Sequence, residues 1–563
     1  MRREVSVVNK KVCSFPILFA LLALLIGTCA VVFPASAQAA PTSTGSITVS
    51  GTVASSYDAY QIFSANVVDG DSDAKNATDL AWASDAVRDA ALPVLHSAGM
   101  PNSQTTAQEA AEWLNTDSHL TSALSAQLAR SLQSSGAVSV ALNAGTAAEL
   151  SCGYWLIVAD DDSVAQGEAG TAPIMALVGG SAVTVKPKAA TPKVSKHVLE
   201  DGTAAWQKAA DATVADDLYW RLSATVPAGL TAYDTYTVRF VDTMSAGLDP
   251  SKVAASMRVY VAAGADGGFD AVQTGKDGRA GTEPAKGWTD ITAQCATKVA
   301  ADGKTFTVRT GDLIAALGGA DAFTAGARVV AVYNAPLNSA CNHGIAKGNP
   351  NEVYLRYPRS PFADQSGDAG FTHTPSDNAC AYTWDLALTK RGSDGDKPLA
   401  GAVLSIADDR GRTLAADGTW DAEGKATVTT GEDGRVTVSG VDSGKLEVRE
   451  LKAPKGYTAF EGIRSVTVKA EDLDVDQVAA AKPKLAITAE SPLRADSADG
   501  STGSLEASLI NTPTGTPPSI TTGGFMPSTG DMAMYAAAAA AVAGAALIVV
   551  ALLVKRGGGS HKE

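Results

Sequence analysis

Short stretches in which apolar and polar residues alternate recur along the chain, a pattern that predicts strands with one buried face. In the first block of such stretches we find Ser46–Val49, Tyr57–Phe63, Cys152–Val158 and Val183–Lys188. Between Ala81 and Leu132 the apolar spacing becomes helical, and we expect this part to pack on the core. Its clearest stripe is Leu120, Leu124, Leu128 and Leu132, with Asp117 or Ser118 as the N-cap.

Two further blocks show strand patterns without a helical stretch. The second block opens with Val194–Val198, continues through Tyr236–Asp242 and closes with Asn351–Tyr357. A polar loop, 358–378, leads to the third block, which runs from Tyr382–Lys390 to Leu509–Asn511. Within the third block, Ala426–Val428 and Val436–Val438 flank Gly431–Gly434, which predicts a hairpin.

The two ends of the chain carry different apolar segments. Arg2, Arg3, Lys10 and Lys11 precede the apolar run Phe15–Phe33, and Ala37-Gln38-Ala39 has the small residues of a signal-peptide cleavage site. These small residues favour a cleaved signal peptide, residues 1–39, over a retained anchor. At the other end, Met532–Val554 is long enough to cross a bilayer as a helix, and Lys555 and Arg556 would keep the tail in the cytoplasm.

Removal of both ends leaves about 490 residues, too many for one hydrophobic core. We therefore expect a mainly β chain with domains at 40–190, 191–378 and 379–514, the first with a helical insertion. Residues 515–563 then hold a tether rich in Pro, Thr and Gly, a transmembrane helix and a basic tail. The whole chain has a net charge of −15; the signal segment removes +3 and the tail +1, so the mature part carries −19.

This acidic composition excludes a nucleic-acid surface, because no basic patch is present. The scattered histidines form no metal-ligand spacing and no catalytic grouping, so we expect no cofactor, no metal and no enzyme. Asp69-Gly70-Asp71-Ser72-Asp73 resembles the start of a calcium loop, but Ala74 and Leu80 occupy the positions where that loop needs Gly and Glu. A solvated turn is the better interpretation.

Four cysteines remain after Cys13 and Cys29 leave with the signal peptide: Cys152, Cys295, Cys341 and Cys380. An exported chain can oxidise them, and four cysteines allow three pairings. We favour a disulfide between Cys341 and Cys380, because it would join the second block to the third. Cys152 and Cys295 either pair or stay free.

Just before the C-terminal apolar segment lies Met526-Pro527-Ser528-Thr529-Gly530. Pro527 favours an extended backbone, and Gly530 leaves the Thr529 carbonyl accessible to a nucleophile. Together with the span and the basic tail, the motif resembles the cell-wall sorting signal of Gram-positive bacteria, Leu-Pro-x-Thr-Gly, with Met526 in place of Leu. The resemblance implies a thioester at Thr529 with a sortase cysteine. The alternative is a proline turn before an ordinary anchor.

A second motif lies in the third block, at Leu446–Tyr457. It resembles the E-box of pilins, Tyr-x-Leu-x-Glu-Thr-x-Ala-Pro-x-Gly-Tyr, and matches at Glu450, Ala453, Pro454, Gly456 and Tyr457. With both terminal signals, the chain is similar to sortase-assembled backbone pilins of the SpaA type. That family implies tandem immunoglobulin-like β-sandwich domains of the CnaA and CnaB types.

The family also implies an intramolecular amide bond between a Lys on the first strand and an Asn on the last, promoted by an Asp or Glu. Burial favours this reaction, since it makes a lysine amine neutral and keeps a carboxyl protonated. The matching residues are Lys390, Glu450 and Asn511 in the third domain, and Lys196, Asp242 and Asn351 in the second. The alternative for each lysine is an ordinary surface charge.

Pilin motifs end in Val-Tyr-Pro-Lys, and the corresponding residues here are Val185-Lys186-Pro187-Lys188. The resemblance makes Lys188 the acceptor that links subunits, with Lys186 and Lys193 as rivals. A linker with incidental lysines is the alternative.

The function implied is the shaft of a covalent surface pilus with a role in adhesion. Its partners would be pilin-class and housekeeping sortases, other copies of the chain, accessory pilins, peptidoglycan and an unknown host ligand. A wall-anchored monomeric adhesin or a minor pilin remains the alternative. Either product would be exported and anchored to the cell wall from a membrane-anchored precursor.

Overall fold

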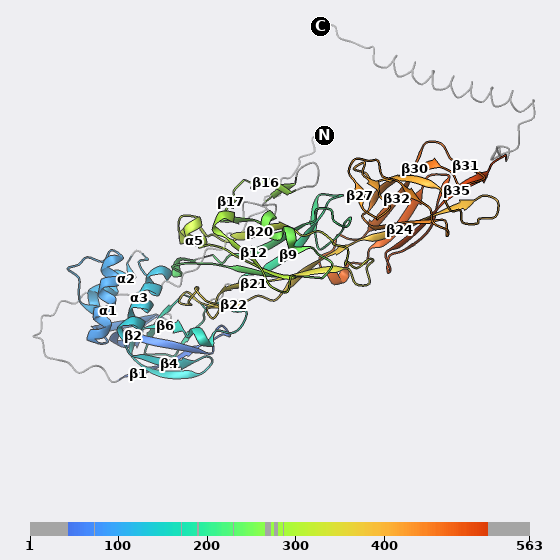
Figure 1. Cartoon of the computed structure of the whole chain (residues 1–563). Coiled ribbons are helices and arrows are strands. Elements are labelled where there is room, and N and C mark those ends of the chain that lie inside the picture. Colours follow the sequence, from blue (N-terminus) through green and yellow to red (C-terminus); the bar gives the residue numbers. More distant parts are fainter. Residues whose placement is uncertain are drawn as a thin grey trace, which may run out of the picture.

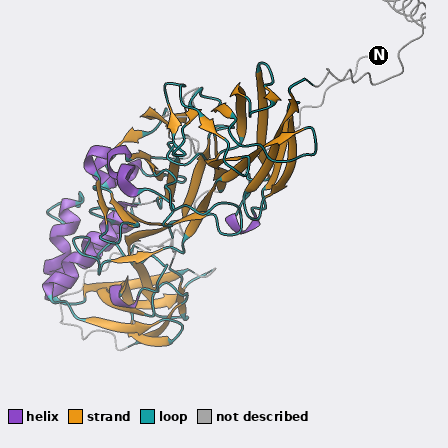
Figure 2. Cartoon of the chain, turned by 45° about the vertical axis from the view of Figure 1, so that its right-hand side comes forward, coloured by secondary structure: helices purple, strands orange, loops and turns teal. Residues whose placement is uncertain are grey.

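The computed structural model describes residues 43–71, 74–116, 118–170, 172–187, 191–228, 230–264, 272–274, 280–284 and 286–515. The expected signal peptide, Lys188, the sorting motif Met526–Gly530 and the expected transmembrane segment lie outside these residues. The described part consists mainly of β-strands in three successive bodies, so the predicted fold class is confirmed (Figures 1 and 2). Within it, no helix is long and apolar enough to cross a membrane.

The first body contains two sheets that pack around a small apolar core. One sheet has the order β5-β1-β8, and the other has the order β3-β2-β6-β7 with β4 paired to β2. Its strands are β1 (Thr44–Val49), β2 (Ser56–Asp69), β3 (Lys75–Trp82), β4 (Ser139–Asn143), β5 (Ala147–Ser151), β6 (Gly153–Ala159), β7 (Ile174–Val178) and β8 (Val183–Val185). Strands β1 and β8 pair in parallel, so the first and last strands of this body are neighbours in one sheet.

The predicted helical insertion is present and lies on the sheet that contains β2 and β6 (Figure 2). It consists of α1 (Asp85–Ser97), α2 (Ala107–Asn115) and α3 (Ser122–Ser135). Leu124, Leu128 and Leu132 are buried in one cluster, as the four-residue stripe predicts. The predicted N-cap is wrong for Ser118: the side chain of Thr121 accepts the hydrogen bond from the Leu124 amide, while Asp117 lies outside the described residues.

The second body is a sandwich of two large sheets, with the orders β10-β9-β12-β20-β14-β17 and β11-β23-β21-β13-β19-β18. The first holds β9 (Val194–Glu200), β10 (Ala205–Gln207), β12 (Tyr219–Thr225), β14 (Arg258–Ala262), β17 (Thr289–Asp290) and β20 (Arg328–Asn334). The second holds β11 (Ala209–Asp211), β13 (Arg239–Met244), β18 (Ala296–Val299), β19 (Thr305–Arg309), β21 (Asn349–Pro358), β23 (Asp377–Tyr382) and, paired to β21, β22 (Phe371–His373). Short segments α4 (Val253–Ser256), α5 (Leu313–Ala316), β15 (Val272–Thr274) and β16 (Ala280–Pro284) complete it.

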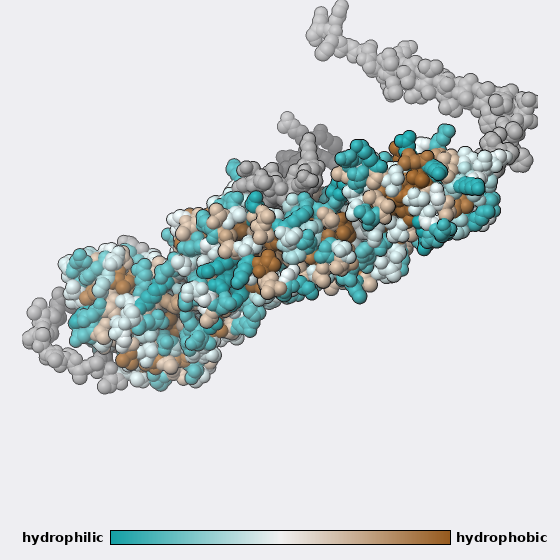
Figure 3. All heavy atoms as spheres, in the orientation of Figure 1, coloured by the Kyte–Doolittle hydropathy of each residue, from teal (hydrophilic) through white to brown (hydrophobic). Residues whose placement is uncertain are grey.

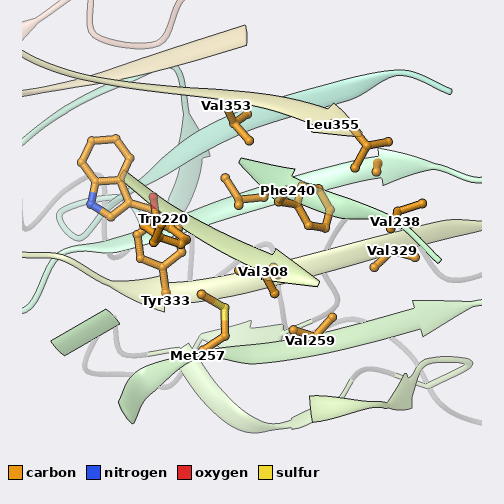
Figure 4. Close-up of a cluster of buried hydrophobic side chains, with 14 of the residues drawn as sticks. Trp220, Val238, Phe240, Met257, Val259, Val308, Val329, Tyr333, Val353 and Leu355 are labelled. Carbon is orange, nitrogen blue, oxygen red and sulfur yellow. The ribbon is translucent and has the colours of Figure 1, made fainter. Parts of the chain in front are cut away.

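The core of this sandwich fills the space between the two sheets (Figure 4). Trp220 and Tyr333 lie on one sheet, and Phe240, Val308 and Leu355 face them from the other. All five are fully buried. Burial of such aromatic and aliphatic side chains is the main stabilising contribution in a domain of this kind.

The third body is a smaller sandwich. One sheet, in the order β29-β24-β35-β31, is formed by β24 (Trp384–Gly392), β29 (Arg435–Val441), β31 (Tyr457–Thr458), β35 (Ser504–Pro513) and β34 (Leu493–Asp499), which pairs with β35. The other contains β25 (Val403–Ala407), β26 (Thr413–Leu414), β27 (Trp420–Asp421), β28 (Val428–Thr429), β30 (Gly444–Lys452), β32 (Ile463–Glu471) and β33 (Lys484–Ala489). Its first strand, β24, pairs in parallel with its last, β35.

The predicted hairpin in the third body is wrong, although its turn is present. The Gly431 amide donates to the Arg435 carbonyl at 3.1 Å, so the chain does reverse at this point. However, β28 pairs with β25 in one sheet, whereas β29 pairs with β24 in the other. The turn therefore connects the two layers of the sandwich rather than two neighbouring strands.

The second and third bodies share a strand boundary and an extensive polar contact. Strand β23 crosses residue 378 and belongs to the second body through its pairs with β11 and β21. Asp211 of the second body is 2% exposed and accepts from Trp384 Nε1 at 2.6 Å and from the Ser443 amide at 2.9 Å. Because its donors come from the third body, the two bodies stabilise each other.

The first and second bodies are joined by a smaller contact. The guanidinium of Arg130 pairs with Asp234 at 3.1 Å and lies 5.4 Å from the ring centroid of Phe362. The Gly170 amide donates to the Arg359 carbonyl at 2.6 Å. On the face seen in Figure 3, hydrophobic residues form only small patches between hydrophilic ones along all three bodies.

The four expected cysteines are free thiols in the structure. Cys341 is buried in the core of the second body and Cys380 in the core of the third. The Cys341 thiol lies 3.6 Å from His343 Nε2, and the Cys380 thiol contacts the Ala381 carbonyl at 3.7 Å. The expected disulfide between them is therefore not formed here, and their pairing in the exported chain stays a prediction.

Peptide mapping of the secreted protein without reductant tests this pairing. We expect one peptide pair that contains Cys341 and Cys380 and separates on reduction, because an oxidising compartment favours the disulfide. Separate alkylation of the two thiols, or a peptide that links Cys152 to either one, would contradict the pairing.

Candidate functional site: two buried lysine–acid–asparagine clusters

The three residues expected in the second domain lie on three strands and point into one core. Lys196 lies on β9 in one sheet, while Asp242 on β13 and Asn351 on β21 lie in the facing sheet. Along β13 and β21 buried and exposed residues alternate, so both side chains point inward with the apolar residues of their strands. All three residues are 0% exposed. The fold thus brings Lys, Asp and Asn together across the sandwich.

Lys196 Nζ contacts Asp242 Oδ2, and both side chains are fully enclosed. The hydroxyl of Tyr333, on β20, lies between the members of the cluster. It accepts from Lys196 Nζ at 2.8 Å and from Asn351 Nδ2 at 2.8 Å, and it donates to Asp242 Oδ2 at 3.1 Å. Two buried oxygens, Asp242 Oδ1 and Asn351 Oδ1, have no hydrogen-bond partner.

Burial controls the protonation of this cluster. It lowers the pKa of Lys196 to about 8, although the nearby Asp242 carboxylate opposes the shift. It raises the pKa of Asp242, with Lys196 opposing that shift. Both directions favour a neutral amine beside a neutral carboxyl, which is the state that nucleophilic attack on an amide requires.

The three residues expected in the third domain also form one cluster. Lys390 on β24 and Asn511 on β35 lie on paired strands, since Lys390 is opposite Leu509 and Asn511 lies two residues further on. Glu450 projects from β30 in the facing sheet. The side chains of Lys390 and Glu450 are both 0% exposed, and Asn511 is 2% exposed.

In this cluster the acid contacts the amide directly. Asn511 Nδ2 donates to Glu450 Oε1 at 2.8 Å and to Oε2 at 3.0 Å. Lys390 Nζ lies 3.7 Å from Glu450 Oε1 and donates to the Leu509 carbonyl at 3.1 Å. Burial lowers the pKa of Lys390 to about 8, and Asn511 Oδ1 is a buried acceptor without a partner.

Each cluster therefore holds a nucleophile, an electrophilic amide and an acid within one buried core. An amine that attacks the amide carbon would form a Lys–Asn amide and release ammonia. In the third domain the acid contacts the amide, so Glu450 can give a proton to the amide and take one back as ammonia leaves. Among the described residues, no group of three or more His, Cys, Asp or Glu side chains is arranged to hold a metal ion.

Tyr333 is the member of the second-domain cluster that the sequence does not reveal. It lies near the end of β20, where every residue from Val329 to Asn334 is buried. In such a fully buried strand, the sequence around a tyrosine of a polar cluster looks the same as the sequence around a tyrosine that only packs in the core. The only available signal is its hydroxyl, because a buried tyrosine usually needs a hydrogen-bond partner.

The lysines expected to link subunits lie in the connection between β8 and β9. Lys186 and Lys193 are exposed, whereas Pro187 is buried, and Lys188 lies outside the described residues. The connection is held at both ends: the Ser50 amide donates to the Val185 carbonyl at 2.8 Å, and the Lys193 amide donates to Thr225 Oγ1 at 2.8 Å. The structure therefore does not distinguish Lys188 from its rivals.

Comparison with known proteins gives a family for part of the chain. Residues 385–482 match the SpaA prealbumin-like fold domain family. The trypsin-resistant surface T6 protein of Streptococcus pyogenes serotype M6 is 31% identical over 134 residues, which is 22% of this chain. The match spans 23% of that protein, so about a quarter of the relative is represented.

Matches to solved structures cover a longer part of the chain. The T6 backbone pilin of serotype M6 Streptococcus pyogenes has 16% sequence identity and a TM-score of 0.45, and the match covers 84% of this chain and 98% of that one. The full-length major pilin SpaD from Corynebacterium diphtheriae has 15% identity and a TM-score of 0.41, with 84% and 100% covered. The segment of the third body from residue 385 to residue 482 is thus similar to the SpaA prealbumin-like fold domain.

Proposed function

We propose that the chain is the shaft subunit of a covalently polymerised surface pilus. The observation that carries this proposal is the presence of two buried Lys–acid–Asn clusters in two consecutive sandwich domains. A buried lysine is costly unless it is paired or consumed, so two in equivalent roles indicate selection for a reaction. The SpaA-type third domain and the similarity to the surface T6 protein support the same class.

In this proposal each cluster forms a Lys–Asn amide inside its own domain. The amides Lys196–Asn351 and Lys390–Asn511 would each connect the first strand of a domain to one of its last strands. A pulling force along the filament would then act on a covalent link rather than on strand hydrogen bonds. The reaction occurs once per molecule, so the chain is a structural protein and not an enzyme.

Joining of subunits would use the C-terminal end of the mature chain and the connection between its first and second domains. A sortase would cleave after Thr529 and transfer its carbonyl to a lysine amine, for which we propose Lys188, on the next subunit. The subunits would then form an open filament, since the donor follows the third domain in the sequence and the acceptor follows the first. A housekeeping sortase would attach the finished fibre to peptidoglycan, where the pilus would act in adhesion.

The mass of the mature ectodomain tests the internal bonds. We expect it to be about 34 Da below the mass calculated from sequence, because each amide bond releases one ammonia of about 17 Da. Peptide mapping should recover Lys196 with Asn351, and Lys390 with Asn511. A mass equal to the calculated value would contradict both bonds.

A denaturing gel of cell-wall extract under reducing conditions tests the polymer. A shaft subunit gives a ladder of covalent multimers, whereas a wall-anchored monomeric adhesin gives a single band. The two tests are independent, because internal bonds could form in a chain that never polymerises.

A further inference from the structure

The two clusters use different groups to contact the asparagine nitrogen that would leave as ammonia. In the third domain both oxygens of Glu450 contact Asn511 Nδ2, so one carboxyl reaches the leaving group directly. In the second domain the acid is Asp242, which is one methylene shorter. Asp242 lies opposite Val353 on β21, and Asn351 is the diagonal neighbour two residues away. Diagonal neighbours are about 7–8 Å apart, beyond the reach of a short side chain.

The Tyr333 hydroxyl occupies the position that bridges this gap. Its oxygen contacts Lys196 Nζ, which must lose a proton during the reaction, and Asn351 Nδ2, which must gain one. It also contacts Asp242, so it connects all three members of the cluster. No described hydrogen bond joins Asp242 to Asn351 directly. A proton therefore has a hydrogen-bonded path from one nitrogen to the other only through Tyr333.

We propose that Tyr333 is the proton relay of the second domain and that amide formation between Lys196 and Asn351 depends on its hydroxyl. This inference rests on the proposed internal bond in the second domain. It assigns to a residue outside every sequence motif a direct part in the reaction. It also predicts that the two domains differ in mechanism, since the third domain has no such intermediate group among the contacts of Lys390, Glu450 and Asn511.

The proton and electron balance of the step is complete without an added reactant. The neutral Lys196 amine forms a bond to Asn351 Cγ, and the carbonyl electron pair moves to Oδ1. Tyr333 then receives a proton from Nζ as it gives its own hydroxyl proton to Nδ2. The Cγ–Nδ2 bond breaks and ammonia leaves with the electron pair. The electron pair on Oδ1 restores the carbonyl, so Asp242 and Tyr333 end as they began.

The surroundings suit Tyr333 to this role. Its ring packs edge-on against Phe306 with centroids 4.8 Å apart, which fixes the hydroxyl without using it. Burial raises the pKa of Tyr333 well above its usual value, so the hydroxyl keeps the proton that it must deliver. Rotation about its C–O bond can turn that proton from Asp242 towards Asn351.

The test is a Tyr333→Phe variant of the full chain, followed by peptide mapping at intervals after a pulse of synthesis. We expect the Lys196–Asn351 bond to form about 10²-fold more slowly, the lower end of what one positioned acid–base group contributes. The Lys390–Asn511 bond should form at the wild-type rate. Tyr357→Phe is the matched control, because it removes another buried hydroxyl from the same core without touching the cluster. An unchanged rate in Tyr333→Phe would overturn the relay.

A double-mutant cycle separates chemistry from packing. With Lys196 present, Tyr333→Phe should lower the melting transition of the second domain when it is measured early after synthesis, before the slowed bond has formed. In a Lys196→Met background, which cannot form the bond, the same change should have little further effect. Equal losses in the two backgrounds, or failure to fold in both, would mean that the hydroxyl is only structural. A wild-type chain without the Lys196–Asn351 bond would instead overturn the bond itself.

Discussion

Replacement of Glu450 by glutamine is expected to leave Lys390 and Asn511 unlinked and to lower the melting temperature of the third domain by about 15 °C. The bond would close a loop of about 120 residues, and removal of such a cross-link from the unfolded ensemble costs about 4–5 kcal/mol. For a domain of this size, that loss of unfolding free energy corresponds to a fall in melting temperature of about 15 °C. Calorimetry of the mature ectodomain measures the shift in melting temperature. Its mass should lie one ammonia, rather than two, below the value calculated from the variant sequence, which would confirm the missing bond.

Glutamine is the informative substitution because it keeps the volume of Glu450 and an acceptor for the Asn511 amide, but carries no exchangeable carboxyl proton. Glu450→Ala should show the same deficit from its own calculated mass with a larger loss of stability, since a cavity adds to the missing bond. Glu447→Gln, on the same strand but with a side chain 40% exposed, is the control and should keep the bond. A cross-linked Glu450→Gln protein would show that the carboxyl is dispensable.

The sequence predicts the two clusters well because each of their residues belongs to a local pattern. Glu450 is part of a motif with fixed spacing, and Lys390 and Asn511 lie at the ends of strands with clear alternation. Period-two alternation determines which side chains point inward, so a polar residue on the inward face is visible before the fold is known. For this reason the strands β1, β9, β21 and β24 lie close to where the pattern predicts them.

Pairing between strands is less predictable, as the failed hairpin shows. The sequence around Gly431–Gly434 correctly indicates a turn, but the partner of β28 is decided by contacts with a distant segment. Thr430 Oγ1 accepts from the Ala402 amide at 3.0 Å and donates to the Leu399 carbonyl at 2.9 Å. These bonds hold the end of β28 against β25, in the sheet opposite β29. No local pattern encodes such a choice between layers.

Tyr333 is missed for a related reason. Its role depends on the relative positions of β9, β13, β20 and β21, which come from parts of the chain more than 100 residues apart. Composition and spacing carry no information about a hydroxyl that becomes central only when two sheets pack face to face. The sequence therefore identifies the Lys, Asp and Asn of the cluster, and the structure is needed to find the group that connects them.

Replacement of Lys188 by arginine is expected to abolish the high-mass ladder in cell-wall extracts while export and anchoring through Thr529 continue. Arginine keeps the positive charge, but its guanidinium stays protonated and cannot attack the thioester. The lysine follows Pro187 in the connection between β8 and β9, and proline restricts the backbone just before it. A denaturing gel of wall extract, made from cells with a pilin-class sortase, measures the ladder.

Lys186→Arg and Lys193→Arg are the matched controls, because both lysines are exposed and lie in the same connection. Each should keep the ladder if Lys188 is the acceptor. A ladder that survives Lys188→Arg but disappears with either control would transfer the acceptor role to that lysine and leave the shaft proposal intact. The absence of a ladder from the wild-type chain has a different meaning: the chain would then be a wall-anchored monomer or a minor pilin, and its two internal bonds would strengthen a single adhesin rather than a filament.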